Sequence, residues 1–195
     1  MNQQSTKKDM PTFEQLQAEL KKDDYKRKYN SLLRNTVFTL IIVAAIAVLV
    51  AMLLLPVLQI SGSSMADELQ DSDIVLTVSH VSCETGDIIA FYYNNHILVK
   101  RVIAAPGQWV DIDDEGYVYV DGVKIYEPYV KDRALGDCNI TLPYQVPSGR
   151  YFVMGDNRAT SIDSRNTVVG CVSDEMIIGK IIARIWPLNR IGTIE

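Results

Sequence analysis

The feature that most constrains this chain is one uninterrupted apolar run, residues 36–55, which reads TVFTLIIVAAIAVLVAMLLL. Its only polar members are Thr36 and Thr39, and no Pro or Gly occurs before Pro56. About 20 apolar residues in a helix cross a hydrocarbon core of about 30 Å. A buried core helix is rarely apolar on every face. A cleaved signal peptide has a shorter apolar region and no long polar leader. We therefore predict an uncleaved membrane anchor at residues 36–58.

Charge predicts the orientation of this anchor. Residues 1–35 have a net charge of +3, and most of their basic side chains lie close to the apolar run: Lys21, Lys22, Lys26, Arg27, Lys28 and Arg34. Residues 36–195 have a net charge of −8, and their first basic residue is Lys100. The positive-inside rule then predicts a single-pass protein of the plasma membrane, with a cytoplasmic tail at residues 1–35 and an extracytoplasmic domain at residues 59–195. We expect the basic tail to contact anionic lipid. The acidic domain disfavours nucleic-acid binding.

Beyond the anchor, short runs rich in Val, Ile and Tyr alternate with turn residues, a pattern typical of strands. Gly116 and Gly122 mark predicted hairpin turns, and the prolines of residues 126–149 predict an irregular excursion. Many short strands and little helix predict an all-β fold of antiparallel sheets, either a barrel or two packed sheets. The predicted strands lie near residues 57–61, 74–78, 87–93, 96–105, 108–113, 116–120, 124–125, 150–154, 168–173 and 177–186.

Two segments carry side chains suited to nucleophilic chemistry. Ser64 follows the anchor in ISGSSM; taken alone, it is a solvated turn serine. Lys100 ends the apolar strand HILVK, where a lysine commonly extends its ammonium to water. If Lys100 is desolvated instead, its pKa falls, and the neutral amine can take a proton from a serine hydroxyl.

A third segment, GDNRATSIDSR at residues 155–165, is dense in polar side chains and follows an apolar strand. Its opposed charges, Asp163 with Arg165 and Asp156 with Arg158, predict a fixed network of ion pairs rather than a solvated loop.

Together, and in this order after one anchor, these segments resemble the bacterial type I signal peptidases, in their shorter Gram-positive form. The matching motifs are Ser64-Met65, Lys100-Arg101 with Pro106-Gly107, residues 155–165, residues 86–91 and the C-terminal stretch 179–192. The resemblance implies an all-β serine endopeptidase that removes signal peptides from exported preproteins. It also implies roles for five residues: Ser64 as nucleophile, Lys100 as general base, Ser161 as the hydrogen-bonding group that orients the lysine, and Asp163 and Arg165 as its salt-bridged support.

Peptide hydrolysis also needs donors for the developing oxyanion. The Ser64 N–H can supply one. Some relatives supply a second from a serine two residues before the nucleophile, where this chain has Gly62, so Ser61 and Ser63 are the candidates. A Ser/Lys mechanism requires no His base, and His96 is interpreted as structural.

The resemblance implies cleavage after small residues at positions −1 and −3. An extended peptide joining a sheet edge presents alternate side chains to one wall, which gives such a rule. The segment 59–63 and the strand 97–100 are the predicted edges. The predicted substrate-binding residues are Ile60, Ser61, Ser63, Ile97, Leu98 and Val99.

One segment departs from the family pattern: Ala66-Asp67-Glu68 stands where relatives have any residue followed by Pro-Thr. The two acidic side chains would raise the pKa of Lys100 if they lay close to it, and we expect them to point away. Two alternatives stay open: a catalytically silent peptide-binding relative, and an enzyme dedicated to a few surface-fibre substrates.

No cofactor or metal is expected, since the chain has only two histidines, His80 and His96, and no Cys-x-x-Cys pair. The pairing of Cys83, Cys138 and Cys171 and the oligomeric state stay open at this point.

Overall fold

A computed structural model describes residues 12–66 and 68–194 of the chain. The helix α1 (Phe13–Leu54) joins the basic tail and the apolar run without a break. Its stretch Leu16–Leu53 is long and apolar enough to cross a membrane, with a mean hydropathy of 2.9 in its most apolar window. The helix ends just before Pro56, which has no N–H to continue it. The chain divides into two compact units, residues 1–50 and 51–195.

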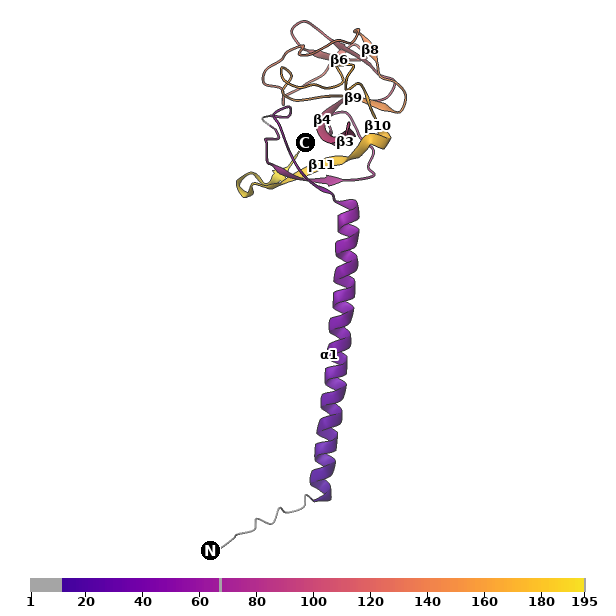
Figure 1. The fold of residues 1–195 in the computed structure, drawn as a ribbon, viewed down its shortest axis with the longest axis vertical. Coiled ribbons are helices and arrows are strands. Elements are labelled where there is room, and N and C mark those ends of the chain that lie inside the picture. Colours follow the sequence, from indigo (N-terminus) through magenta and orange to yellow (C-terminus); the bar gives the residue numbers. More distant parts are fainter. Residues whose placement is uncertain (1–11, 67, 195) are drawn as a thin grey trace. The chain divides into compact units, whose positions relative to one another are not determined.

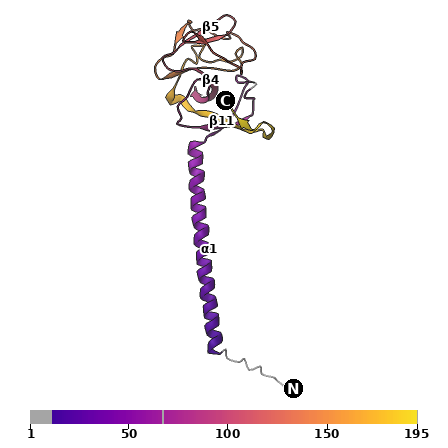
Figure 2. The same ribbon diagram turned by 180° about the vertical axis from the view of Figure 1, so that it is seen from behind.

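The second unit is built from antiparallel sheets, as predicted. Its larger sheet has the order β1-β2-β11-β3-β4-β9-β10, with β12 paired to β11, and its smaller sheet has the order β7-β6-β5-β8. Within this unit the smaller sheet lies at the end away from β11 (Figure 1), and the view from behind shows β5 at that same end (Figure 2). The strands are β1 (Val57–Gln59), β2 (Ile74–Val78), β3 (Ile88–Tyr93), β4 (His96–Ala104), β5 (Trp109–Ile112), β6 (Val118–Val120), β7 (Val123–Lys124), β8 (Tyr144–Gln145), β9 (Arg150–Met154), β10 (Val172–Ser173), β11 (Ile177–Trp186) and β12 (Gly192–Thr193).

Each predicted strand has a counterpart, but the run predicted at 168–173 keeps only β10. The residues before β10 form a turn, because the Asn166 carbonyl accepts hydrogen bonds from the N–H groups of Val169 and Gly170. The two-residue strands β8 and β12 were not predicted, since two residues carry no periodicity.

Two hydrophobic clusters position the segments that carry the chemistry. Alternate residues of β5 and β6 are buried with Phe152 and Met154 of β9, and together they join the two sheets. A second cluster contains Met65, Leu69 and Val75. Because Met65 is fully buried in this cluster, the adjacent Ser64 is held at the surface of the core.

The larger sheet leaves two strand edges unpaired within the described residues. β1 is its terminal strand. β4 pairs along its whole first half with β3, but β9 pairs only with Arg101, Val102 and Ala104 on the other side. The backbone of residues 96–100 is therefore open on one side to a further strand.

Candidate active site

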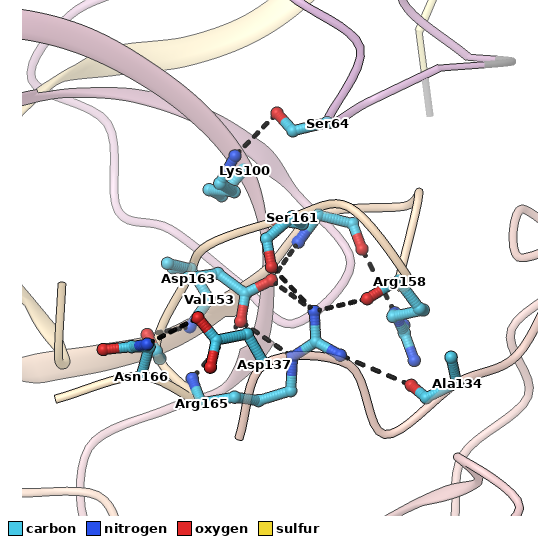
Figure 3. A network of polar contacts seen from close by, with 12 residues as sticks. Ser64, Lys100, Ala134, Asp137, Val153, Arg158, Ser161, Asp163, Arg165 and Asn166 are labelled. Carbon is cyan, nitrogen blue, oxygen red and sulfur yellow. Dashed lines mark hydrogen bonds and ion pairs between the residues drawn. The ribbon is translucent and has the colours of Figure 1, made fainter. Parts of the chain in front are cut away.

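Ser64 and Lys100 meet in the folded chain, although 36 residues separate them. The Lys100 Nζ donates a hydrogen bond to the Ser64 Oγ at 2.6 Å (Figure 3). Lys100 lies on β4 and is only 3% exposed, whereas Ser64 lies in the turn between β1 and β2 and is partly exposed. The arrangement thus pairs an accessible hydroxyl with a buried amine.

Burial lowers the pKa of Lys100 from 10.5 to about 8. The nearby carboxylates of Asp163 and Asp156 act in the opposite direction, and the Arg165 guanidinium adds to the lowering. With a pKa of about 8, roughly a tenth of the amine is neutral at pH 7, far more than for a solvated lysine. Lys100 can therefore act as a base near neutral pH.

The turn that carries Ser64 is fixed by hydrogen bonds on both sides. The Gly62 N–H donates to the Asp71 carboxylate at 2.9 Å. The Asn157 N–H donates to the Ser64 carbonyl at 3.1 Å, and the Asn157 side-chain amide donates to the Ser63 carbonyl at 3.3 Å. Because its N–H already has an acceptor, Gly62 offers no free backbone donor for an oxyanion.

Asp163 and Arg165 form the predicted ion pair, with both side chains fully buried. The guanidinium binds the carboxylate through two hydrogen bonds, Nε to Oδ1 and Nη2 to Oδ2, each 2.8 Å long. Burial raises the pKa of Asp163, but the Arg165 guanidinium more than offsets this and holds that pKa below its ordinary value. Arg165 also donates to the Leu135, Arg158 and Ser161 carbonyls, so it pins several loop segments at one point (Figure 3).

Ser161 is buried beside this pair, and its Oγ is without a hydrogen-bond partner in the described part of the chain. The hydroxyl faces Asp163 closely enough to help lower the pKa of that carboxylate, yet without the geometry of a hydrogen bond. The expected bond from Ser161 to Lys100 is thus not formed in this structure, in which the lysine bonds to Ser64.

Gly155 brings Ser161 and the nucleophile turn together. A Cβ atom at this position would lie 2.3 Å from the Ser161 Oγ and 2.5 Å from the Ser64 carbonyl oxygen. Only glycine fits this close approach. The sequence analysis quoted Gly155 as one letter of a motif and gave it no role, since steric contact of this kind has no local sequence signal.

The predicted pairing of Asp156 with Arg158 is wrong, although both belong to an ion-pair network. Asp156 binds Arg101 of β4 at 3.0 Å (Nε–Oδ1) and 2.9 Å (Nη2–Oδ2). Arg158 binds Glu127 instead. The chain turns at Asn157, whose carbonyl accepts the Ser161 N–H, and the two side chains on either side of the turn reach partners on different elements.

A cavity of about 210 Å³ runs from Ser64 and Lys100 between the two unpaired strand edges. Of the predicted substrate-binding residues, Ile60, Ser61, Ile97, Leu98 and Val99 line it. Ser63 does not, because its carbonyl faces Asn157 on the other side of the turn.

The departure at residues 66–68 has a partial structural account. Glu68 raises the pKa of Arg101 and is not among the charges that shift Lys100. Asp67 lies outside the described residues. The part of the chain that the structure describes contains no group of three or more potential metal ligands. Cys83, Cys138 and Cys171, all within that part, are free thiols. His96 is exposed, and His80 lines a separate cavity with Ser79 and Asp174.

Comparisons with known proteins agree with this geometry. The family model described as "Signal peptidase, peptidase S26" matches residues 33–186. Signal peptidase I U of Bacillus subtilis is 35% identical over 166 residues, covering 79% of this chain and 86% of that protein. A signal peptidase I of Bacillus amyloliquefaciens is 33% identical over 184 residues, covering 88% and 98%. A crystal structure of a signal peptidase I from Enterococcus faecalis has 33% identity and a TM-score of 0.43, covering 52% of this chain and 98% of that one.

Proposed function

The chain belongs to the signal peptidase I family of serine endopeptidases, and we propose that it removes signal peptides with Ser64 as nucleophile and Lys100 as general base. The observation that carries this proposal is the 2.6 Å contact between an accessible hydroxyl and an amine whose pKa is lowered by burial.

The reaction follows from these two groups. Neutral Lys100 takes the proton of Ser64 as its Oγ attacks the scissile carbonyl, and the Ser64 N–H stabilises the oxyanion. The lysine ammonium then gives this proton to the leaving amine, which is the new N-terminus of the mature protein. Lys100, neutral again, activates the water that hydrolyses the ester on Ser64 and releases the signal peptide.

The groove supports an extended substrate. A peptide that enters between β1 and the first half of β4 finds unpaired N–H and C=O groups on both sides. Alternate side chains then face the floor of the groove, which gives a rule with a period of two. In line with the family resemblance, we propose small residues at positions −1 and −3.

The helix supports a membrane-anchored enzyme. We propose that α1 spans the plasma membrane with its basic end in the cytoplasm and the β unit outside. Ser64 follows the end of the helix by only ten residues, which span at most about 35 Å when extended. Tethering on this scale raises the local concentration of enzyme at the surface where preproteins present their cleavage sites.

The replacement of the usual Pro-Thr by Asp67-Glu68 favours one second candidate, an enzyme that serves a narrow set of substrates. Efficient cleavage of many unrelated signal peptides would exclude it.

The proposal is tested by cleavage of several preproteins in liposomes, with N-terminal sequencing of the product. The wild type is expected to cut, and Ser64→Ala and Lys100→Met to yield no product. His96→Ala and His80→Ala serve as controls and should cut as the wild type does. Continued cutting by Lys100→Met, or no cutting by a folded wild type on any preprotein, would overturn it.

A further inference from the structure

The segment after β7 contains a buried acid to which the mechanism above assigns no part. Glu127 lies in an irregular loop and is 2% exposed, while its neighbour Tyr126 is 88% exposed. Burying a carboxylate costs free energy unless it is paired and hydrogen-bonded. The loop therefore turns this side chain inward for a specific set of contacts.

Glu127 holds Arg158, which is fully buried. The Arg158 guanidinium binds both carboxylate oxygens, with Nη1 3.3 Å from Oε2 and a closer contact between Nη2 and Oε1. Its Nε donates to the Gly155 carbonyl at 3.1 Å, and its own carbonyl accepts from Arg165 at 3.0 Å (Figure 3). Glu127 thus fixes the residue that connects Gly155 with the Asp163–Arg165 pair.

Tyr129, two residues later, holds the other arginine of the network. Its ring lies 3.9 Å from the Arg101 guanidinium carbon, within the range of a cation–π contact. Arg101 directly follows Lys100 and binds Asp156, which directly follows Gly155. The Tyr129 hydroxyl donates to Glu127 at 3.5 Å, which links the two contacts. Burial raises the pKa of Tyr129, so this hydroxyl keeps its proton.

Both arginines lead to the same place. Arg158 acts on the carbonyl of Gly155 and Arg101 acts on the residue after it, while Gly155 is packed against Ser161 and the Ser64 carbonyl. We propose that Glu127, with Tyr129, is a positioning residue for the Ser64–Lys100 pair, holding Gly155 and Ser161 at the spacing that catalysis needs. The inference rests on the proposed function and extends its machinery to a loop outside the family motifs noted above.

The test compares Glu127→Gln, which removes the charge at nearly constant shape, with Glu127→Asp, which keeps it. Because misplacement of catalytic groups by about 1 Å can cost about 100-fold, we expect Glu127→Gln to lower kcat by about 10- to 100-fold. KM should stay within about twofold, since the groove is untouched, and Glu127→Asp should recover part of the loss. Arg158→Met should lower kcat similarly, and the double variant Glu127→Gln/Arg158→Met should lose no more than either single variant.

A matched control separates positioning from stability. Val118→Ala truncates a fully buried residue of β6, distant from the site, and lowers the Tm without touching the network. Its kcat should match the wild type below its Tm. The proposal is overturned if folded Glu127→Gln has the kcat of Val118→Ala, if its loss appears only in KM, or if the double variant shows additive losses.

A second readout does not depend on turnover. Acetic anhydride labels neutral amines, and peptide mass spectrometry reports the rate at Lys100. A loosened Gly155 and Ser161 should expose the amine, so Lys100 should label faster in Glu127→Gln than in the wild type or Val118→Ala. If the wild type cleaves no preprotein, the proposed function fails, and this rate alone decides the inference: equal rates in all three proteins would overturn it.

Discussion

Lys100 shows how the same burial that prepares a base also weakens the fold. Its pKa falls from 10.5 in the unfolded chain to about 8 in the folded one, so the unfolded state binds the proton more tightly between these values. The stability that the neutral amine allows is complete above pH 10.5 and is lost as the pH falls through 8. At neutral pH the folded protein therefore bears the full cost of burying the ammonium.

The first prediction follows from this sign. Lys100→Met should abolish activity and yet raise the Tm at pH 7, with the gain shrinking as the pH is raised from 8 to 10.5. The control is Lys180→Met, which removes a partly exposed ion pair with Asp87 and should leave the Tm equal or slightly lower. Thermal unfolding across this pH range measures both. A Tm lowered by Lys100→Met at pH 7 would mean that the amine is not desolvated.

Glycine 155 carries a second prediction at this scale. Gly155→Ala places a methyl group 2.3 Å from the Ser161 Oγ, so either the serine or the nucleophile turn must move, and kcat should fall by at least about 100-fold. Gly192→Ala is the matched control, because nothing lies within 4 Å of its added methyl group. Steady-state kinetics on the two variants decide the point, and equal activity would refute the close contact.

At the level of single residues, the sequence allowed prediction of what local motifs carry and little of what the fold adds. The Asp163–Arg165 pair lies within one motif and was predicted. The partners of Asp156 and Arg158 were not, because Arg101 and Glu127 come from distant segments. The Ser64–Lys100 contact rested on the family resemblance, since neither residue alone favours a catalytic role.

Among the elements, β4 matters most for function, because one strand serves two purposes. Its second half is paired on both sides and buried, whereas its first half has a free edge along the groove. Strand β9 begins pairing only at Arg101, next to the base, and this limit leaves room for a substrate strand.

The free edge predicts a period-two response to backbone changes in the substrate. N-methylation of single amides in a signal-peptide substrate should reduce kcat/KM strongly at alternate positions and weakly between them, because only every second N–H of an extended strand points toward one edge. A series of N-methylated peptides measures this. Equal losses at every position would contradict strand addition.

The element predictions succeeded where burial gave a clear period. β5 and β6 alternate buried and partly exposed residues, as a half-buried strand does, and their pattern is legible in the sequence. β8 and β12 exist only because tertiary neighbours offer them an edge. The loop that contains Glu127 was predicted to be irregular, which is correct for its backbone and silent about its buried acid.

The whole molecule consists of an apolar helix and a β unit joined by a very short connection, and function depends on that connection. Inserting about 20 Gly/Ser residues after Leu55 allows the β unit to wander by an r.m.s. distance of about 25 Å. Cleavage of membrane-embedded preproteins should then slow, because the effective concentration falls, while cleavage of a short soluble peptide should not change. Parallel assays with the two substrates in liposomes test this. Unchanged cleavage of both would mean that tethering contributes nothing.

The central claim is that neutral Lys100 is the base for Ser64, and the pH dependence of kcat/KM tests it most directly, since this quantity reports the pKa of the free enzyme's essential base. The account predicts that kcat/KM rises with pH through a midpoint of about 8 and that Lys100→Met eliminates the activity. A midpoint near the ordinary histidine value of about 6.5, retained in Lys100→Met, would contradict it.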